Sequence, residues 1–482
     1  MKKIVILLVV LLGCIPVTVL AQKQFAFKDG KFKIAQFTDL HWTPQSPKCA
    51  ETVATIRAVL KAEQPDIAVL SGDVVTEDPA MEGWKAVVDI FNEAKVPFVV
   101  TMGNHDAEYM TKNDIYDLLL KSPYYVGAKG PEEIMGCGNC VIPVYDSQKK
   151  EKVEALLYCM DSNDYQPNKL YGAYDWIHFD QIDWYRKQSA RFTAANNGSP
   201  VPALAFFHIP LLEYNELAGD GKTYGNDREG GVASSNINSG MFASFIDMKD
   251  VMGVFAGHDH DNDFIGIDKG IALGYGRVTG TDAYGSLIRG ARIIELFEGK
   301  FKFDTWIATP AGREAEYYYP SGLNSEEAQT MVYQPAKNVT VGKHGVAYTY
   351  YEGKCKRVAA IASCKVVKEG TMKNFSIKDA PVTDHFAYNF RTLIEIPEKG
   401  VYRFYTFSDD GSVLYIDGKQ VVDNDGGHSA RRAEGKIALE KGLHELQVLY
   451  FEDYMGQELE VGYSGRNILE TPLPDNMLYL PE

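Results

Sequence analysis

The sequence predicts an α/β domain followed by an all-β domain, and three observations carry this prediction. The chain has 482 residues, which is too long for one hydrophobic core and indicates two or three domains. Residues 22–306 alternate short apolar runs with segments of helical periodicity, whereas residues 344–472 hold strand-like runs between glycine-containing turns. Residues 307–343 lose both patterns and predict a linker, and residues 473–482 are expected to form a C-terminal tail.

The composition is that of an ordinary globular protein, with 45% apolar and 24% charged residues. The formal net charge of −16 argues against a nucleic-acid backbone as partner, because phosphate backbones bind to basic surfaces. A small or macromolecular phosphate ester can still bind where metal ions supply positive charge locally.

The N-terminus has the pattern of an export signal. Lys2 and Lys3 precede an apolar stretch over residues 4–20, and Ala21 ends a small-residue cleavage motif. We predict a signal peptide over residues 1–21 and an exported protein that is periplasmic, attached to the cell surface or secreted. A retained or lipid-modified anchor is the alternative, because the apolar stretch nearly reaches spanning length and contains Cys14. Membrane contact is expected only in that case.

Cleavage after residue 21 leaves an even number of cysteines: Cys49, Cys137, Cys140, Cys159, Cys355 and Cys364. In an exported protein this number permits disulfides, but the sequence does not give their connectivity. Cys355 and Cys364 both belong to the second domain and are candidates for pairing there. Cys137 and Cys140 have the spacing of half a zinc motif, but no second half completes it, which favours a disulfide or free thiols.

Amphipathic helices are expected between the first apolar runs. Residues 51–64 place Val53, Ile56 and Val59 on one helical face, and residues 83–95 again show helical periodicity. A strand, a helix and a second strand in this order form a βαβ unit, which implies parallel strands joined by right-handed crossovers.

Polar fragments follow directly on five of the apolar runs. They are DLH at 39–41, GD at 72–73, GNHD at 103–106, His208, and GHDH at 257–260. The carboxyl ends of parallel strands are where ligands and catalytic groups collect in open α/β sheets. Five of the ten histidines lie in these fragments, and core packing does not explain that placement.

These residue types suit a two-metal site. Hydrolysis of a phosphate ester needs an activated water and neutralised phosphoryl oxygens, and two metal ions about 3.5–4 Å apart provide both. Such a pair needs a bridging carboxylate together with oxygen and imidazole ligands. The candidates are Asp39, His41, Asp73, Asn104, His208, His258 and His260. The absence of cysteine from this set favours Fe, Mn or Zn over a structural thiolate zinc site.

In order and spacing, DLH, GD, GNHD, His208 and GHDH resemble the calcineurin-like metallophosphoesterases over roughly residues 31–300. Longer pieces such as GHDHDNDF and SSNINSGMF look most like the purple-acid-phosphatase-related branch. The resemblance implies a β-sandwich flanked by helices. It also implies one metal held by Asp39, His41, Asp73 and His260, and a second held by Asp73, Asn104, His208 and His258, with Asp73 as the bridge.

The same resemblance implies two catalytic residues. His105 would contact the phosphate and serve as general acid for the leaving group, and Asp106 would orient it. One position departs from the purple acid phosphatases. Their metal-binding tyrosine, which gives the colour as a phenolate on ferric iron, is replaced here by Thr76. We therefore expect a colourless protein that contains Mn, Zn or Fe.

Substrate contacts are predicted with less support from the pattern. The candidates are Asn238, Arg277, Tyr284 and Arg289, together with Asn236 and Arg292. Arginine suits bidentate phosphate binding, but salt-bridged or solvated side chains explain the same residues. Tyr171, Tyr174 and Trp176 form either an aromatic wall or part of the core. Asp259 is expected to form a turn or support the ligands, and structural or surface roles are expected for His178, His344, His385, His428 and His444.

Residues 344–472 resemble a PA14 domain, a β-sandwich-like module of which several members bind carbohydrate through calcium. Asp409 and Asp410 match the aspartate pair that holds this ion. Oxygen ligands are also available from Asp417, Asp423, Asn424 and Asp425. The alternative is a tight turn between strands, in which Asp and Gly are common.

The sequence thus predicts an exported, dimetal-dependent phosphoesterase that favours phosphate monoesters, with a second domain that is a candidate for glycan binding. Two alternatives remain open: a phosphodiesterase of the same fold, or a glycan-binding surface protein with an inactive phosphoesterase domain. A decayed site is expected to lack at least one ligand, and all seven are present.

Overall fold

The protein is described by a computed structural model that covers residues 24–219, 221 and 223–482. The predicted signal peptide, and the alternative membrane anchor, lie outside the described residues. No helix within that part of the chain is long and apolar enough to cross a membrane.

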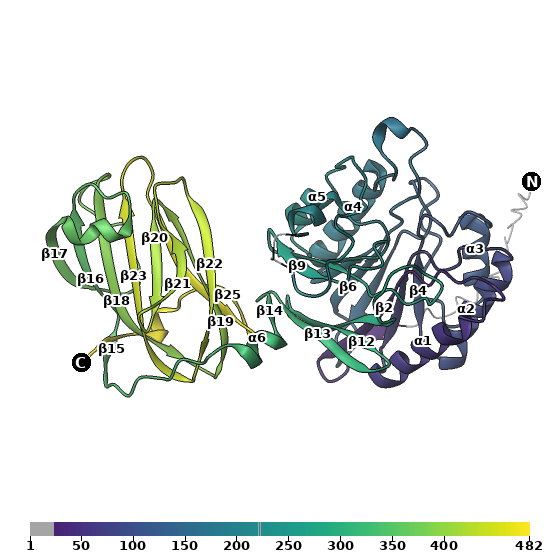
Figure 1. Ribbon diagram of the computed structural model, residues 1–482, viewed down its shortest axis with the longest axis horizontal. Coiled ribbons are helices and arrows are strands. Elements are labelled where there is room, and N and C mark those ends of the chain that lie inside the picture. Colours follow the sequence, from purple (N-terminus) through teal and green to yellow (C-terminus); the bar gives the residue numbers. More distant parts are fainter. Residues whose placement is uncertain (1–23, 220, 222) are drawn as a thin grey trace, which may run out of the picture.

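The first domain is a sandwich of two seven-stranded sheets with helices on its outer faces (Figure 1). One sheet has the order β1 (Phe25–Ala26), β5 (Cys140–Tyr145), β6 (Val153–Cys159), β7 (Ala203–Phe206), β8 (Val251–Ala256), β10 (Ile271–Tyr275) and β9 (Ile265–Asp268). The other has the order β14 (Leu323–Asn324), β13 (Gly312–Tyr319), β12 (Phe303–Thr309), β11 (Ala291–Phe297), β2 (Lys31–Phe37), β3 (Ile67–Ser71) and β4 (Phe98–Thr101).

The alternation of side chains along the strands builds two layers of core. In β2, Ile34 faces the other sheet, whereas Ala35 and Phe37 face the helices. The helices α1 (Cys49–Glu63), α2 (Ala80–Ala94) and α3 (Lys112–Leu119) cover one sheet, and α4 (Phe179–Ala195) and α5 (Met241–Met248) cover the other. Burying one large aliphatic side chain stabilises a fold by about 1.5–3 kcal/mol, so this double core fixes the sandwich firmly.

Within each sheet, the strands that precede the polar fragments run parallel to one another. β2, β3 and β4 are parallel in one sheet, and β6, β7, β8 and β10 are parallel in the other. The carboxyl ends of these strands therefore meet at one edge of each sheet, as the βαβ pattern predicted. The predicted α/β domain followed by an all-β domain is confirmed.

The linker predicted over residues 307–343 is wrong for its first part. β12 continues to Thr309, β13 pairs with it antiparallel, and Tyr317 and Tyr319 are buried in the core between the sheets. The sequence missed this hairpin because the first half of β13 is charged and exposed, as at the edge of a sheet, and only its tyrosine end packs inward. The short helix α6 (Ser325–Thr330) follows, and the second domain begins with β15 (Val341–His344).

The second domain consists of two antiparallel sheets. The larger contains β15, β26 (Leu478–Pro481), β18 (Phe386–Ile396), β23 (Gly442–Glu452), β20 (Ser412–Ile416) and β21 (Lys419–Asn424) in this order. In the same sheet, β16 (Val346–Glu352) pairs with β18, and β17 (Lys365–Met372) pairs with β16. The smaller contains β22 (Arg431–Leu439), β19 (Gly400–Asp409), β24 (Glu458–Gly465) and β25 (Ile468–Pro472). The tail predicted over residues 473–482 is wrong, because β26 pairs with both β15 and β18 and buries Leu478.

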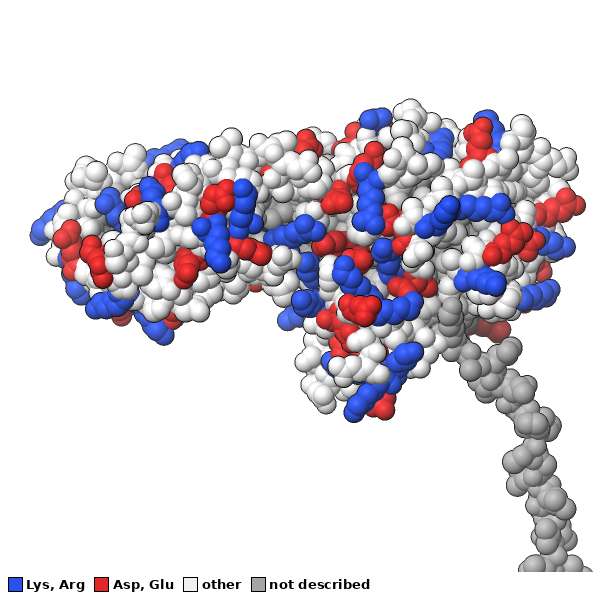
Figure 2. Space-filling view, turned by 90° about the horizontal axis from the view of Figure 1, so that it is seen from below, with Lys and Arg blue, Asp and Glu red and all other residues white. Residues whose placement is uncertain are grey.

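Polar contacts join the two domains. Arg403 Nη2 donates to the Pro320 carbonyl at 2.9 Å, and Lys436 Nζ donates to the Gly322 carbonyl at 3.0 Å. Positive and negative side chains are interspersed over both domains on the face shown in Figure 2, rather than gathered by sign.

The six cysteines of the described chain are present as thiols. The Sγ atoms of Cys355 and Cys364 lie 2.8 Å apart, so the pairing considered for the second domain would require little movement of the backbone. Cys140 lies directly opposite Cys159 in the β5–β6 ladder. Within the described residues, none of the potential metal-binding clusters includes a cysteine.

Candidate metal centre

The five polar fragments converge at the carboxyl ends of β2, β3, β4, β7 and β8. Backbone hydrogen bonds tie neighbouring fragments together. The Asp39 N–H donates to the Gly72 carbonyl at 3.1 Å, and the Gly257 N–H donates to the His208 carbonyl at 2.9 Å. The turns are therefore joined within each sheet, and the contact of His208 Nδ1 with the Ser71 carbonyl joins the two sheets.

Four of the candidate ligands have left-handed backbone conformations. The φ angles are 52° at Asp39, 41° at His41, 48° at Asp73 and 80° at His258. Such conformations are unfavourable for residues other than glycine, at roughly 1–3 kcal/mol each, and they cluster at functional sites. The turns thus hold these side chains in place at an energetic cost that the surrounding packing offsets.

Asp39, His41 and His260 form the first cluster. The Nε2 atom of His260 lies 3.2 Å from Asp39 Oδ1 and 3.1 Å from Nε2 of His41. Asp39 is further held by the His258 N–H and by the Thr38 hydroxyl, which donates to Asp39 Oδ2 at 2.8 Å. Three donor atoms thus point at one location, with two imidazole nitrogens facing each other.

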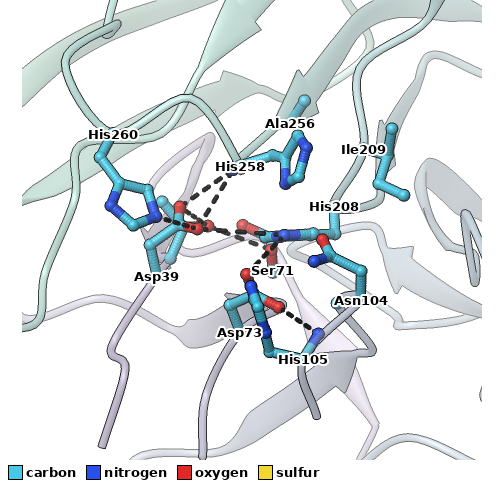
Figure 3. Close-up of polar contacts among 12 residues, drawn as sticks. Asp39, Ser71, Asp73, Asn104, His105, His208, Ile209, Ala256, His258 and His260 are labelled. Atoms are coloured by element: carbon cyan, nitrogen blue, oxygen red, sulfur yellow. Dashed lines mark hydrogen bonds and ion pairs between the residues drawn. The ribbon is translucent and has the colours of Figure 1, made fainter. Parts of the chain in front are cut away.

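Asp73, His208 and His258 form the second cluster (Figure 3). Asp73 Oδ2 lies 3.2 Å from His208 Nε2 and 3.6 Å from Nε2 of His41, which belongs to the first cluster. The Asp73 carboxylate therefore lies between the two groups. That position matches the bridging role that the sequence predicted for it.

The unpaired polar atoms fit two cations bound at this place. Asn104 Oδ1, His208 Nε2 and His258 Nε2 are buried and have no hydrogen-bond partner. The His208 ring donates from Nδ1 to the Ser71 carbonyl at 2.8 Å, which leaves the lone pair of Nε2 free. Buried polar groups without partners are costly, and a metal ion satisfies lone pairs of this kind. The nitrogen and oxygen donors suit Fe, Mn or Zn.

The electrostatics of the centre differ between its histidines. Although burial opposes protonation of His208, Asp73 and Asp39 raise the pKa of this ring to about 10, so it must lose a proton to bind a cation. Burial, assisted for His258 by the nearby His208, lowers the pKa of His258 to about 3, and burial lowers that of His41 to about 4. Both rings are therefore neutral ligands at neutral pH. Burial opposes ionisation of Asp39, but the neighbouring His260 and His208 lower the pKa of this carboxyl to about 2, so it is anionic.

His105 lies at the open side of the centre, with about a third of its side chain exposed. Its partner is Glu108, whose Oε1 is 2.8 Å from His105 Nδ1. The hydroxyl of Tyr165 lies 3.2 Å from the other ring nitrogen and accepts a hydrogen bond from Asn104 Nδ2 at 3.0 Å. Sequence reasoning missed both Glu108 and Tyr165. Glu108 follows GNHD within the same turn, so its proximity to His105 was the available signal.

The predicted role of Asp106 is wrong. Its carboxylate accepts hydrogen bonds from the N–H groups of Val74, Val75 and Gly103 at 2.8–3.0 Å and makes no contact with the His105 ring. Asp106 thus holds the backbone just after Asp73 and just before Asn104. Glu108, rather than Asp106, orients His105.

The predicted substrate arginines are engaged in the fold. Arg277 is 1% exposed, and its guanidinium donates to Asp263, Glu314 and a carbonyl. Arg289 donates to the carbonyls of residues 283–285 and 287, and Arg292 is buried among Tyr275 O, Asp263 O and Thr305. The substrate role predicted for Arg277 and Arg292 is wrong, because both are buried and bonded within the fold. Asn238 donates to Glu213 at 2.7 Å on the surface, and the substrate role of Asn238 and Arg289 stays a prediction.

Tyrosines and Asp259 lie beside the ligands. Tyr284 is 56% exposed and stacks on His260 with 3.9 Å between ring centroids. Tyr174 packs edge-on against His258 at 4.5 Å, whereas Tyr171 packs on Trp176. Asp259 accepts hydrogen bonds from the Tyr275 hydroxyl and the Ala233 N–H, which agrees with a supporting role.

A third cluster lies in the second domain, and we call Asp409, Asp410 and Glu452 the acidic cluster. The Oε1 atom of Glu452 is buried without a hydrogen-bond partner. The sequence pointed to the aspartate pair but missed Glu452, which lies at the end of β23, more than 40 residues further along the chain. Asp417 is not part of the cluster, because it pairs with His444 at 2.7 Å.

The other predicted calcium ligands are also used locally. Asp425 Oδ1 accepts from the Val358 N–H at 2.8 Å, and Asn424 Oδ1 accepts from Arg431. The Asp423 side chain accepts from the Asp425 N–H at 3.2 Å. Of the six oxygen-bearing residues that the sequence proposed, the structure therefore groups only Asp409 and Asp410.

Comparison with known proteins agrees with this geometry. The sequence model of the calcineurin-like phosphoesterases matches residues 32–262, and that of the PA14 domain matches residues 342–475. A protein named probable inactive purple acid phosphatase 29, from Arabidopsis thaliana, is 33% identical over 61% of this chain and 84% of its own length. The phosphatase DCR2 of Saccharomyces cerevisiae is 28% identical over 52% of this chain and 48% of its own length.

Among solved structures, a dimetal phosphatase from Danio rerio aligns with 60% of this chain and 98% of its own, at 11% identity. Its TM-score of 0.42 is too low to support a conclusion about function. The family rests instead on the match of the sequence model and on the long alignment with the Arabidopsis protein. The chain belongs to the calcineurin-like phosphoesterases and carries a PA14 domain after its phosphoesterase domain.

Proposed function

We propose that the first domain hydrolyses phosphate monoesters with two metal ions bound at the metal centre. The observation that carries this proposal is the set of buried, unpaired donor atoms on Asn104, His208 and His258 beside the shared carboxylate of Asp73. Hydrophobic packing does not require such atoms to meet, and they are costly to bury without a cation.

Two bound cations would neutralise the phosphoryl oxygens and lower the pKa of a coordinated water. The chain itself supplies the proton for the leaving group. When the oxygen of a water that has lost one proton to the solvent replaces the ester oxygen on phosphorus, the P–O bond to the leaving group breaks and His105 donates a proton to the departing oxygen. Glu108 orients the imidazole by its contact with Nδ1. The other ring nitrogen, Nε2, then faces the metal centre on the side where Tyr165 lies.

The word inactive in the name of the Arabidopsis relative applies to that protein. In this chain the seven predicted donors are present and converge, which favours hydrolysis over a decayed site. Phosphodiester hydrolysis is the nearest alternative because it uses the same chemistry. A glycan-binding surface protein with an inactive first domain is the other.

Turnover of p-nitrophenyl phosphate and of its bis-ester separates these readings. The purified chain is stripped with EDTA and reloaded with Mn²⁺, Zn²⁺ or Fe, and bound metal is counted by elemental analysis. We expect about two metal ions per chain and faster turnover of the monoester. Preferred turnover of the bis-ester would support the phosphodiesterase. The metal-loaded protein is expected to be colourless, because Thr76 provides no phenolate.

For the second domain we propose calcium-dependent glycan binding at the acidic cluster. Its support is the oxygen-only donor set, which suits Ca²⁺, and the unpaired buried oxygen of Glu452. We also propose that the chain is exported, on the basis of its N-terminal sequence. A glycan array probed in calcium and in EGTA tests the binding, and N-terminal sequencing of the protein recovered outside the cytoplasm tests cleavage near Ala21.

A further inference from the structure

Arg277, Arg289 and Lys112, three basic residues of the first domain, are engaged within the fold. Arg277 and Arg289 are engaged as described above, and Lys112 is bound by Asp161 and Asp164 at 2.9 and 3.2 Å. Acidic side chains, in contrast, lie near the site. Glu108 contacts His105, and Glu229 accepts from the Asp261 N–H. A substrate with negatively charged groups beyond the reacting phosphate would be repelled there.

Aromatic rings surround the centre instead. Tyr284 covers His260 in a nearly parallel stack at 3.9 Å, and more than half of Tyr284 remains exposed. From His260 the series continues to His41 at 4.7 Å and from His41 to His105 at 5.6 Å between ring centroids. The imidazole rings of the first cluster thus form a continuous series of contacts between the exposed Tyr284 and His105, the proposed general acid.

The series continues on the other side of His105. Tyr165 lies edge-on to His105 at 5.8 Å, and Tyr174 stacks on Tyr165 at 6.0 Å. Tyr174 in turn contacts His258 of the second cluster at 4.5 Å. We call Tyr165, Tyr174 and Tyr284 the tyrosine rim. Both clusters are therefore flanked by tyrosines, of which Tyr165 is 40% and Tyr284 56% exposed.

The loop that carries two members of the rim is held in place. Tyr165 and Tyr174 are paired across it as an isolated antiparallel bridge, and the Gln166 N–H donates to the Ala173 carbonyl at 2.8 Å. The Tyr165 hydroxyl is fixed further by Asn104. A rim whose rings are ordered before binding loses little conformational entropy when a flat ligand packs against it.

We propose that the tyrosine rim selects phosphate monoesters whose leaving group is an uncharged aromatic ring, such as a phenol. This inference rests on the proposed hydrolysis and adds the class of substrate. A phosphate held at the centre places its organic part among the rings of the rim. One aromatic contact contributes about 0.5–1.5 kcal/mol beyond the area buried, which corresponds to roughly two- to tenfold in affinity, and the buried ring area adds to this.

Binding of non-hydrolysable phosphonates tests the proposal without relying on turnover. Phenylphosphonate, methylphosphonate and inorganic phosphate are titrated calorimetrically into the metal-loaded full chain. We expect phenylphosphonate to bind about tenfold more tightly than methylphosphonate. Tyr284→Ala is expected to reduce this ratio to about twofold, and Tyr284→Phe to preserve it, because the ring and not the hydroxyl makes the contact.

Tyr171→Ala is the control, because Tyr171 is exposed like Tyr284 and belongs to the loop of Tyr165 and Tyr174, but it packs on Trp176 rather than on a metal-site histidine. It is expected to keep the tenfold ratio, and every variant must carry as much metal as the unchanged chain. Equal binding of the two phosphonates by the unchanged chain overturns the proposal, as does a loss of the ratio in Tyr171→Ala equal to that in Tyr284→Ala. If phosphate itself fails to bind the metal-loaded protein, the proposed hydrolysis fails as well.

Discussion

The metal centre and the acidic cluster are two groups of acidic side chains that differ in what surrounds them. At the metal centre, Asp39 and Asp73 are accompanied by four imidazoles, and both carboxylates lie between histidine nitrogens. In the acidic cluster, Asp409, Asp410 and Glu452 face one another with no basic side chain among them. The imidazoles stabilise the charge of the first pair, whereas the second group lacks this compensation.

This difference predicts the ion that each region binds. Mixed nitrogen and oxygen donors suit Fe, Mn or Zn, whereas oxygen donors alone suit calcium. It also predicts opposite pKa shifts. Histidines hold the pKa of Asp39 at about 2, whereas burial and the two aspartates raise that of Glu452 to about 8. The metal centre and the acidic cluster are thus distinguished by the side chains that surround their carboxylates, rather than by the carboxylates themselves.

The largest expected effect is that of removing the bridge of the metal centre. Asp73→Asn should lower turnover of p-nitrophenyl phosphate by about 10³-fold or more, because the shared charge that holds two cations is lost. Bound metal, counted by elemental analysis, should fall below two ions per chain. Asp268→Asn, which changes a partly buried aspartate paired with the exposed Lys269, is the control and should change neither quantity. Full metal content in Asp73→Asn would contradict the bridging role.

Calcium should distinguish the acidic cluster from the metal centre. At a concentration of one hundred times Kd, a ligand stabilises the folded state by about 2.7 kcal/mol, so Ca²⁺ should raise the midpoint of thermal unfolding. Glu452→Gln should reduce this shift strongly, and Glu445→Gln, an exposed change on the same strand, should leave it intact. If calcium raised the midpoint of thermal unfolding equally in both variants, the ion would bind elsewhere.

The support of the metal centre can be tested without any metal. Asp106→Asn replaces the carboxylate, which accepts hydrogen bonds from three backbone N–H groups, by an amide. The NH₂ group of the amide cannot accept, so one of the three N–H donors loses its partner. We expect a loss of about 2 kcal/mol in the free energy of unfolding of the metal-free protein, measured with denaturant. Asp89→Asn on the exposed face of α2 should stay within roughly 0.5 kcal/mol of the unchanged chain. A similarly small effect of Asp106→Asn would refute its supporting role.

The smallest expected effect is the opposite response of the two regions to pH. The raised pKa of Glu452 means that its protonated form stabilises the fold below its usual value of 4.5, and this stabilisation is lost as the pH rises towards about 8. The lowered pKa of Asp39 means that its contribution is present above 3.8 and is lost as the pH falls towards about 2. Unfolding of the metal-free protein across pH checks both signs.

Glu452→Gln should flatten the alkaline part of that profile and Asp39→Asn the acidic part, relative to the unchanged chain. The same buffers without added calcium are needed, because calcium favours the ionised form of Glu452 and would remove its pH dependence. A profile of Glu452→Gln that still falls between pH 5 and 8 as steeply as before would assign the dependence to other groups.

Much of the site could be predicted from the sequence because its residues follow a local rule. Asp39, Asp73 and His208 each come directly after a buried strand, and parallel strands deliver their carboxyl ends to one edge. The periodicity of strands and helices identified the two domains for the same reason. The hairpin of β12 and β13 escaped prediction, because an edge strand with one exposed half lacks the apolar pattern of a central strand.

The sequence by itself determined which donors are present and in what order, since strand ends are a local property of the chain. The tertiary structure alone decided which charges meet. It turned Asp106 towards three backbone N–H groups, gave Glu108 to His105, and brought Glu452 to the aspartate pair. These partners are chosen by packing between elements distant in the sequence or by the exact direction of a side chain in a turn, and neither leaves a periodic signal in the sequence.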